Sequence, residues 1–251
     1  MALGRGALSE VTDDPEIAAS ASDVVVLATP VLGILDWMER LAPSLQREVL
    51  VTDVGSTKLA ISRAAARLFP QEGRGEAREK VEFLGGHPMA GKEHGGAAIA
   101  DAELFQGAMW LFTSPGKGTL GEEWTAWVTR FGARTLDMDA ARHDEICAWV
   151  SHVPQMLSTA LAAMLEERLR EAPELAADLM QVGGRALQEM TRLGASPFSM
   201  WRDIAHTNAD AIAGSLQALE QKVAHLRENL KTPELREEFA EANAFGRRRQ
   251  Q

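Results

Sequence analysis

The first half of the chain alternates between short, continuous apolar runs and stretches whose apolar residues recur at helical spacing. Residues 23–31, DVVVLATPV, form an apolar run that contains a proline near its end. Such a run is typical of a parallel strand that is buried on both faces. Residues 32–45 follow with apolar positions that share one broad helical face. The pattern therefore predicts a strand and then a helix.

The same alternation continues over the next 70 residues. Residues 48–56, 81–91 and 108–114 read as further strands, and TKLAISRAAARLF reads as a helix between the first two. Strands that alternate with helices predict a doubly wound α/β sheet. The polar or Gly-containing exits ATPV, DVGSTK and GGHPMAGKEHGG follow three of these strands. Because ligands bind at the carboxyl ends of parallel strands, we expect these exits to converge on one crevice.

The pattern changes after about residue 120. GEEWTAWVTRFG predicts a helix and ARTLDMD a short strand, and the rest of the chain is nearly all helical in its spacing. We therefore expect two domains, an α/β domain over 1–120 and a helical domain over 121–251.

Composition narrows the class of protein. The chain has 251 residues and a formal net charge of −10, which argues against nucleic acid or an anionic membrane as its main partner. One cysteine, Cys147, excludes an intrachain disulfide and favours a reducing compartment; its helical surroundings predict a small buried hydrophobe. No apolar run approaches the ~18 residues of a membrane span, and a signal-peptide pattern is absent. We expect a cytoplasmic protein.

His87 is the first candidate for chemistry. It leaves a predicted buried strand beside two glycines and a proline, at the edge where ligands bind. A histidine there can act as a general base near neutral pH. The alternative is a structural histidine bonded to a loop carbonyl.

His143 and His152 lie nine residues apart in HDEICAWVSHVP, which places them on opposite faces of a continuous helix. The pair lacks the i, i+4 spacing of metal ligands, and we expect no cysteine or second histidine at ligand spacing, so we predict no metal site. His143 reads as a residue of the helix start, where Asp144 suits the helix dipole. For His152 a structural and a functional role stay open, and Pro154 is expected to adjust the helix near it.

Arg192 lies near a helix end, before a Gly-Ala-Ser-Pro turn. An arginine at such a junction can bind a carboxylate through two parallel hydrogen bonds, or it can form a surface ion pair. Arg202 and Asp203 read as scaffold residues that cap and brace a helix.

Five segments in this order resemble one known family: VVVLATPV, DVGSTK, GGHPMAGKEHGG, HDEICAWVSHVP and MTRLGASPFSMWRDI. The family is the prephenate/arogenate dehydrogenases of tyrosine biosynthesis, and the resemblance runs from about residue 15 to about residue 230. It implies a Rossmann-type nucleotide-binding domain followed by a helical substrate and dimerisation domain. It also implies a homodimer, and oxidative decarboxylation of prephenate to 4-hydroxyphenylpyruvate with NAD or NADP.

The resemblance also implies roles for individual residues. His87 corresponds to the catalytic histidine that withdraws the proton of the 4-hydroxyl, and Ser56 to a serine near that hydroxyl and the nicotinamide. Arg192 corresponds to the arginine that holds a substrate carboxylate. The other implied residues are Glu93, Lys92, His152 and Gln155 for substrate, and Ala28, Thr29 and Pro30 for the cofactor cleft.

Two departures from the family pattern limit this transfer. The family's S-H-L-P-H segment ends here in Gln155 instead of histidine. The choice between prephenate and arogenate as substrate therefore stays open. Gly4-Arg5-Gly6-Ala7-Leu8-Ser9 looks like a dinucleotide loop, yet no strand precedes it. By resemblance, about 40–50 residues, the size of a β-α-β unit, are missing before it. The choice between NAD and NADP as cofactor also stays open, because the residue that recognises the ribose 2′ position belongs to that unit.

Three functions remain at this point. One is a prephenate or arogenate dehydrogenase with a truncated start, for which the activity of residues 1–251 alone stays open. Another is a catalytically silent paralogue that mainly dimerises. The third is a different Rossmann-type dehydrogenase, which the two specific segments around His87 and Arg192 disfavour.

Overall fold

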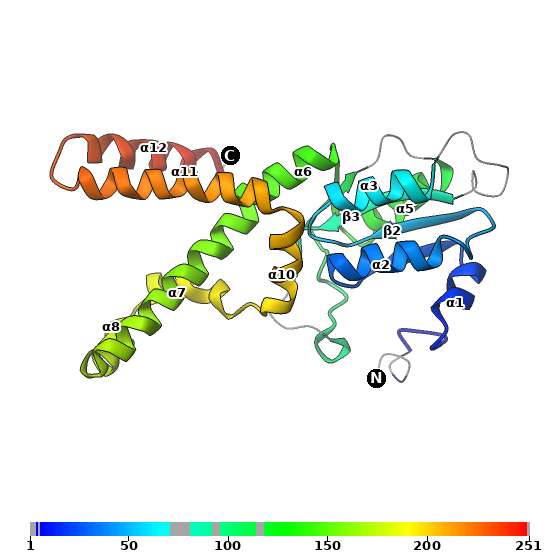
Figure 1. Ribbon diagram of the computed structural model, residues 1–251, viewed down its shortest axis with the longest axis horizontal. Coiled ribbons are helices and arrows are strands. Elements are labelled where there is room, and N and C mark those ends of the chain that lie inside the picture. The colour runs from blue at the N-terminus through cyan, green and yellow to red at the C-terminus, as the bar shows by residue number, and fades with distance from the viewer. Residues whose placement is uncertain (1–3, 5, 71–80, 92–95, 114–117, 250–251) are drawn as a thin grey trace.

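A five-stranded sheet forms the first part of the molecule (Figure 1), here in a computed structural model that describes residues 4, 6–70, 81–91, 96–113 and 118–249. Its spatial order is the chain order: β1 Val24–Leu27, β2 Val49–Asp53, β3 Val81–Pro88, β4 Met109–Thr113 and β5 Arg134–Asp137. The pairs β1–β2, β2–β3 and β4–β5 are parallel, whereas β3–β4 is antiparallel. The carboxyl ends of β1, β2 and β3 therefore meet at one edge of the sheet, as predicted.

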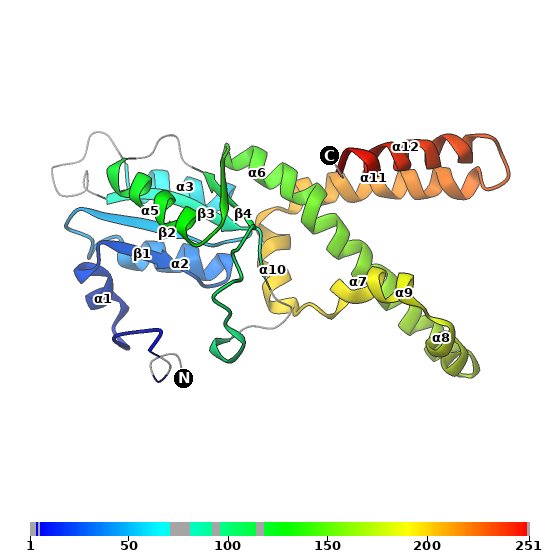
Figure 2. The same cartoon turned by 180° about the vertical axis from the view of Figure 1, so that it is seen from behind.

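Helices cover both faces of this sheet. The residues of β2 alternate between two cores, because successive side chains of a strand point to opposite faces. Val49 and Val51 pack with α2 Val31–Leu41 and α3 Leu59–Leu68, while Leu50 packs with α5 Thr119–Arg130. Figures 1 and 2 show α2 and α3 on one side of the sheet and α5 on the other. This is the layered α/β architecture that the strand–helix alternation predicts.

The strand pairing moves the domain boundary past residue 120. Both α5 and β5 belong to the sheet domain, since β5 pairs with β4 and α5 packs on β2 and β3. The helical domain begins only with α6 Ala140–Cys147. α5 and β5, which follow the expected boundary at about residue 120, therefore lie with the sheet.

The helical domain is built around one long bent helix. It runs through α6, a π-helical turn η3 Ala148–His152 and α7 Val153–Glu171. Pro154 follows the π-helical turn; proline lacks an N–H donor and crowds the carbonyl four residues before it, and the wider turn relieves both. The remaining elements are η4 Pro173–Leu175, α8 Ala176–Val182, α9 Arg185–Thr191, η5 Arg192–Ala195, α10 Phe198–Thr207, α11 Ala209–Glu228 and α12 Glu234–Arg249.

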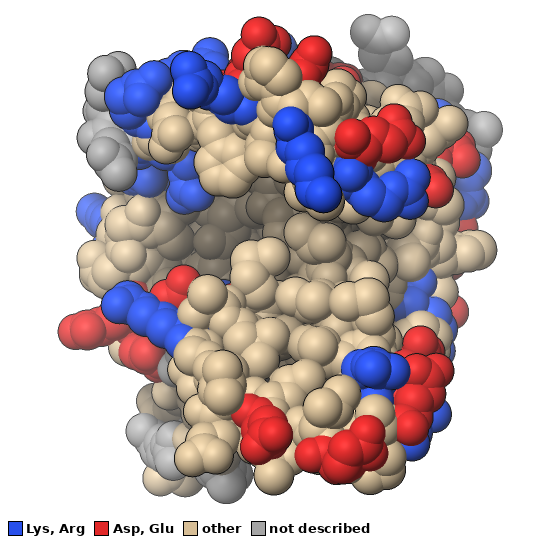
Figure 3. All heavy atoms as spheres, turned by 90° about the vertical axis from the view of Figure 1, so that its left-hand side faces the viewer, with Lys and Arg blue, Asp and Glu red and all other residues tan. Residues whose placement is uncertain are grey.

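α11 and α12 lie side by side as an antiparallel hairpin, and α7 crosses beneath them (Figures 1 and 2). The far end of the helical domain is hollowed, and uncharged residues line most of the hollow (Figure 3). Across the described parts of the chain, no helix has both the length and the apolar character that crossing a membrane requires.

The amino-terminal glycines do not form a dinucleotide loop in the part that the structure describes. Residues 6–14 are turn and irregular backbone, and the first helix, α1 Pro15–Ala21, begins only after Asp14 caps it. The resemblance of Gly4 and Gly6 to the glycine fingerprint therefore has no structural counterpart there.

α10 joins the two domains. The Asp203 carboxylate accepts a hydrogen bond from the backbone N–H of Leu32 at 3.1 Å, in the first turn of α2. Next to this contact, the hydroxyls of Thr57 and Thr207 lie 2.7 Å apart. Asp203 thus caps a helix, as expected, but the helix belongs to the other domain.

Candidate active site

His87 sits at the carboxyl end of β3, where Gly86 brings β3 close to β2. A Cβ on Gly86 would lie 2.6 Å from the carbonyl oxygen of Asp53, so a side chain at that position would separate the two strands. His87 itself is 8% exposed, which makes it a buried histidine with one small opening to the surface. The local sequence thus places one imidazole at the edge where β1, β2 and β3 all end.

A chain of side chains runs from Asp144 through His143 to His87. His143 Nδ1 lies 2.8 Å from Asp144 Oδ1, and His143 Nε2 lies 2.9 Å from His87 Nδ1. A carboxylate only accepts, so His143 donates from Nδ1 and presents a lone pair at Nε2. His87 must then donate from Nδ1, which leaves the lone pair on its Nε2. The contacts therefore define a neutral His87 whose Nε2 can accept a proton.

Asp144 is held by the start of α3. Its two carboxylate oxygens accept hydrogen bonds from the backbone N–H groups of Lys58 at 2.7 Å and Leu59 at 2.9 Å. An acidic side chain is favourable there because the N-terminal N–H groups lack partners within the helix. Asp144 caps α3 rather than serving only its own helix, which corrects the expectation drawn from its place near the start of α6.

A buried ion pair lies where β2 and β3 end and α3 begins. The Lys58 ammonium donates to the Asp53 carboxylate and, at 2.7 Å, to the carbonyl oxygen of Gly86. Asp53 also accepts from the N–H of Gly55 at 2.7 Å and of Gly86 at 3.3 Å. Burial lowers the pKa of Lys58, and Asp53 opposes that shift. The pair ties the ends of β2 and β3 together directly behind His87.

The pKa of His87 lies well below its usual value. Burial is the main cause, and repulsion from His143, Lys58 and His152 adds to it. Burial disfavours the charged imidazolium, so the neutral form that carries a free lone pair predominates near neutral pH. Geometry and electrostatics therefore agree on a neutral histidine with a free lone pair, although the same surroundings disfavour the imidazolium that forms when it accepts a proton.

The other residues at this edge follow β1 and β2. Ala28, Thr29 and Pro30 are exposed between the end of β1 and the start of α2, and Ser56 is half-buried between β2 and α3. These positions lie at the sheet edge on which the polar exits of the strands were expected to converge. Lys92 and Glu93 lie outside the described residues.

Gln155 contacts the segment that carries Arg192 and is itself 4% exposed. Its Nε2 donates to the carbonyl oxygen of Leu193 at 2.6 Å, and its Oε1 accepts from the Ser196 hydroxyl at 3.2 Å. The predicted substrate-binding side chain is thus bonded to the 3-10 turn η5, which Arg192 begins. This arrangement makes Gln155 a support for the Arg192 turn.

His152 is a core residue of the helical domain. It is 1% exposed, packs edge-on against Trp201 with ring centroids 5.8 Å apart, and lies 3.3 Å from the Asn208 amide nitrogen. Burial lowers the pKa of His152 to about 4. His152 thus has a structural role, in which it joins the π-helical turn to α10 and α11, while its contact with substrate stays a prediction from the family resemblance.

The expectation that no cysteine stands at ligand spacing is wrong, because Cys147 follows His143 on α6. The two residues are four positions apart, so they share one face of α6 and both point at His87. The Cys147 sulfur lies 3.6 Å from His143 Nε2 and 4.0 Å from His87 Nδ1. The i, i+4 spacing was visible in HDEIC, but only the docking of α6 on α3 shows what it faces.

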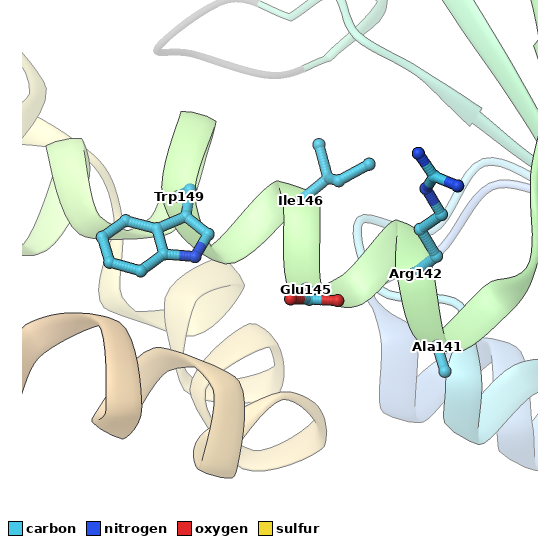
Figure 4. A pocket seen from close by; sticks show the side chains of 5 residues that line it. All are labelled: Ala141, Arg142, Glu145, Ile146 and Trp149. Atoms are coloured by element: carbon cyan, nitrogen blue, oxygen red, sulfur yellow. The ribbon is translucent and has the colours of Figure 1, made fainter.

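A separate pocket of about 530 Å³ lies on the other side of α6. Figure 4 shows the residues that line it, namely Ala141, Arg142, Glu145, Ile146 and Trp149, projecting from successive turns of this one segment. At about 100° per residue they point away from His143 and Cys147. This pocket therefore takes no part in the chemistry at His87.

Two family matches cover most of the chain. Residues 1–135 match the family described as "Prephenate dehydrogenase, nucleotide-binding domain", and residues 139–243 match "Prephenate dehydrogenase, dimerization domain". The division between the two matches coincides with the division between β5 and α6.

Individual relatives agree with these matches. The chain is 31% identical over 215 residues to the prephenate dehydrogenase of Bacillus subtilis (strain 168), covering 84% of this chain and 54% of the relative. A Synechocystis arogenate dehydrogenase superposes with a TM-score of 0.77 at 26% identity, over 98% of this chain and 86% of that one. A prephenate dehydrogenase from Aquifex aeolicus, in complex with hydroxyphenyl propionate and NAD+, superposes with a TM-score of 0.80 at 25% identity. The match covers 99% of this chain and 83% of that one. The chain spans about half the length of the curated prephenate dehydrogenases that it matches.

Proposed function

The chain belongs to the prephenate dehydrogenase family, and from this premise we propose that it oxidises prephenate to 4-hydroxyphenylpyruvate with loss of CO2, using NAD+ or NADP+. The observation that carries the proposal is the hydrogen-bonded series Asp144–His143–His87, which ends at the carboxyl edge of a parallel sheet. Such an edge is where ligands of open α/β sheets bind.

The ends of β1 and β2 fit the nicotinamide end of a dinucleotide. Ala28, Thr29 and Pro30 form an exposed turn at the start of α2, and Ser56 follows β2. A group bound against them lies next to His87, because these strands end at one edge. When bound, the nicotinamide supplies hydride acceptance. We assign Ala28, Thr29, Pro30 and Ser56 to holding it.

His87 acts on the ring hydroxyl of the substrate. Its Nε2 lone pair accepts the hydroxyl proton as the carbon that bears this hydroxyl loses its hydride and becomes a carbonyl carbon. Loss of CO2 then makes the ring aromatic and turns the carbonyl oxygen into a phenolate, which takes the proton back from His87 Nε2 to give the phenol. Because His143 accepts the hydrogen bond from Nδ1, His87 keeps the tautomer that the step needs. We assign Ser56 a contact with the same hydroxyl, since it follows β2 at the sheet edge where β3 also ends.

Arg192 is the proposed partner of a substrate carboxylate, since its planar guanidinium matches a carboxylate through two parallel hydrogen bonds. Gln155 supports this role through its bonds to Leu193 and Ser196, which fix the turn that Arg192 begins. Lys92 and Glu93 stay predictions from the family resemblance.

Arogenate is the second candidate substrate. Its ring chemistry is the same, so the geometry around His87 serves both compounds. Similarity to an arogenate dehydrogenase favours it, as does Gln155 where the family's S-H-L-P-H segment ends in histidine. The two substrates differ in the side chain that carries a keto group or an amine.

We also propose a homodimer formed through the helical domain. Large apolar side chains are exposed along its helices: Trp149, Val150, Met164, Val223, Phe239 and Phe245. The uncharged hollow in Figure 3 lies on the same domain. Exposed apolar surface of this kind marks interaction sites. Light scattering tests the proposal, which predicts twice the mass of one chain and fails if a monomer persists at micromolar concentration.

The reaction is tested with the full-length protein by following NAD(P)H absorbance with prephenate and with arogenate, each combined with NAD+ and with NADP+. The proposal predicts reduction of at least one nucleotide, coupled to an aromatic product detected by chromatography. The ratio of kcat/KM for the two substrates decides between prephenate and arogenate. Absence of NAD(P)H with all four combinations contradicts the proposal.

A further inference from the structure

His87, His143 and Cys147 form a compact set of three potential metal ligands. One ligand atom from each residue lies within 4.8 Å of the other two, and all three residues are buried. Their separations are 2.9 Å between the nitrogens and 3.6 and 4.0 Å from sulfur to nitrogen. Tetrahedral zinc with typical bond lengths places two nitrogens about 3.3 Å apart and nitrogen and sulfur about 3.5 Å apart. Shifts of a few tenths of an ångström convert one arrangement into the other.

From this cluster we propose that the protein binds a divalent transition metal, Zn²⁺ or Co²⁺, through His87 Nδ1, His143 Nε2 and Cys147 Sγ. One thiolate and two imidazoles suit metals of intermediate softness. Of the three residues only His87 has exposed surface, so we propose that the fourth coordination position lies on the His87 side. The proposed site is thus a three-ligand site that keeps one position open.

The surroundings already contain an outer ligand shell. His143 donates its other ring N–H to Asp144, which is the contact that commonly orients a zinc-bound histidine. Asp144 is fixed in turn by two backbone N–H groups at the start of α3. The lone pair of His143 Nε2 is therefore aimed at the metal position before any metal arrives.

The buried charges also accommodate the ion. Asp53 and Asp144 carry two negative charges around the site and Lys58 carries one positive charge, so this buried group carries one net negative charge. A divalent metal with one thiolate adds one positive charge and makes the buried group neutral. Burying a charge is costly unless it is compensated, so this balance favours binding.

Metal binding moves two protons. A metal binds the thiolate and not the thiol, so ligation by Cys147 releases one proton to solvent. The Nδ1 proton of His87 cannot stay on a ligating nitrogen and is carried on Nε2 instead. His87 then has no lone pair for the substrate hydroxyl. The metal is therefore an inhibitor of the reaction, a consequence that rests on the proposed function.

Cobalt provides a test that needs no turnover. Cys147 is the single cysteine of the chain, so a thiolate-to-cobalt charge-transfer band can arise from no other residue. We expect the chelator-treated protein to develop this band with one equivalent of Co²⁺, together with the visible bands of tetrahedral cobalt. One equivalent of Zn²⁺ should then abolish both. Absence of the charge-transfer band at saturating Co²⁺ overturns the proposal.

Variants assign the ligands. Cys147→Ala should remove the charge-transfer band, and His143→Asn should weaken Co²⁺ binding by more than about a hundredfold, beyond the effect of losing an outer-shell partner. His206→Asn, which changes an exposed histidine of α10, is the matched control and should bind like the wild type. Full affinity in His143→Asn, with its fold checked by circular dichroism, overturns the assignment.

Rate measurements then separate this inference from the proposed function. If the full-length protein turns over, Zn²⁺ should lower the initial rate of the wild type at least tenfold more than that of Cys147→Ala, each compared with its own metal-free rate. A protein that shows the cobalt band without turnover supports the site and contradicts the reaction. A protein that turns over but shows no cobalt band supports the reaction and contradicts the metal site.

Discussion

His87 Nδ1 lies 2.9 Å from His143 Nε2, although 56 positions separate the two residues in the chain. The contact joins β3 of the sheet domain to α6 of the helical domain. The proposed base therefore depends on how the two domains dock, and Asp144 and Asp203 hold that docking by capping α3 and α2. The proposed base is therefore oriented by residues that also hold the two domains together.

His143 should act as a positioning residue for His87 through the hydrogen bond between them. His143→Ala removes the acceptor for His87 Nδ1–H, so His87 samples the wrong tautomer and kcat should fall at least about tenfold with little change in KM. His143→Gln offers an amide oxygen as a replacement acceptor and should recover part of kcat. Steady-state kinetics on both variants checks this. An unchanged kcat in His143→Ala removes His143 from the role.

Gln155 should affect binding of substrate rather than turnover. Gln155→Ala frees the η5 turn from its bonds to Leu193 and Ser196, so Arg192 is less well placed for a carboxylate. We expect KM for the substrate to rise about tenfold, the equivalent of one charge-assisted contact, while kcat stays within about twofold. Gln217→Ala, at an exposed glutamine of α11, is the control. A lower kcat at unchanged KM would refute this role.

The buried pair of Lys58 and Asp53 should dominate the stability of this corner. Lys58→Met leaves the Asp53 carboxylate buried without its partner, which typically costs about 3–5 kcal/mol of unfolding free energy. Asp53→Asn combined with Lys58→Met removes both charges and should be less destabilised than the single variant. Urea denaturation measures both. If the double variant is the less stable one, the paired-charge explanation is wrong.

His152 should make the fold sensitive to acid. Its pKa of about 4 in the folded protein lies below the unfolded value near 6.5, so protonation favours unfolding. The stability is complete above pH 6.5 and is lost as the pH falls toward 4, by about 3 kcal/mol for this group. Attraction to Asp144 and repulsion from His143 partly offset each other in setting this value.

Urea denaturation at a series of pH values tests this prediction. His152→Gln has no titrating ring and should lose less stability than the wild type between pH 6.5 and 4. His225→Gln, at an exposed histidine of α11, should follow the wild type. Parallel curves for the wild type and His152→Gln would show that His152 does not titrate as stated.

Sequence patterns predicted the parts of this molecule that local spacing determines. The strands of the sheet, the edge at which β1–β3 end, the place of His87 on that edge and the adjustment of the helix before Pro154 all follow from runs of neighbouring residues. The limit appears between α8 and α9: the sequence was expected to be nearly all helical after residue 140, but the helix is interrupted at Gly183 and Gly184.

Local spacing did not predict the contacts between segments that are distant in the sequence. His143 and Cys147 share a face of α6 by spacing alone, yet the partner of that face is set by docking on α3 and β3. Asp144 likewise has the same local pattern whether it caps its own helix or another. The π-helical turn also matters, since it changes the phase between His143 and His152 so that both are buried.

The role of His87 as proton acceptor is tested most directly by the kcat of His87→Asn in the full-length protein, with saturating nucleotide and either substrate. Asparagine keeps a hydrogen-bond donor toward His143 but cannot take up the hydroxyl proton. We predict that kcat falls by about 10²-fold or more while the KM for the substrate changes little. A kcat equal to that of the wild type would contradict the assignment of His87 as the base.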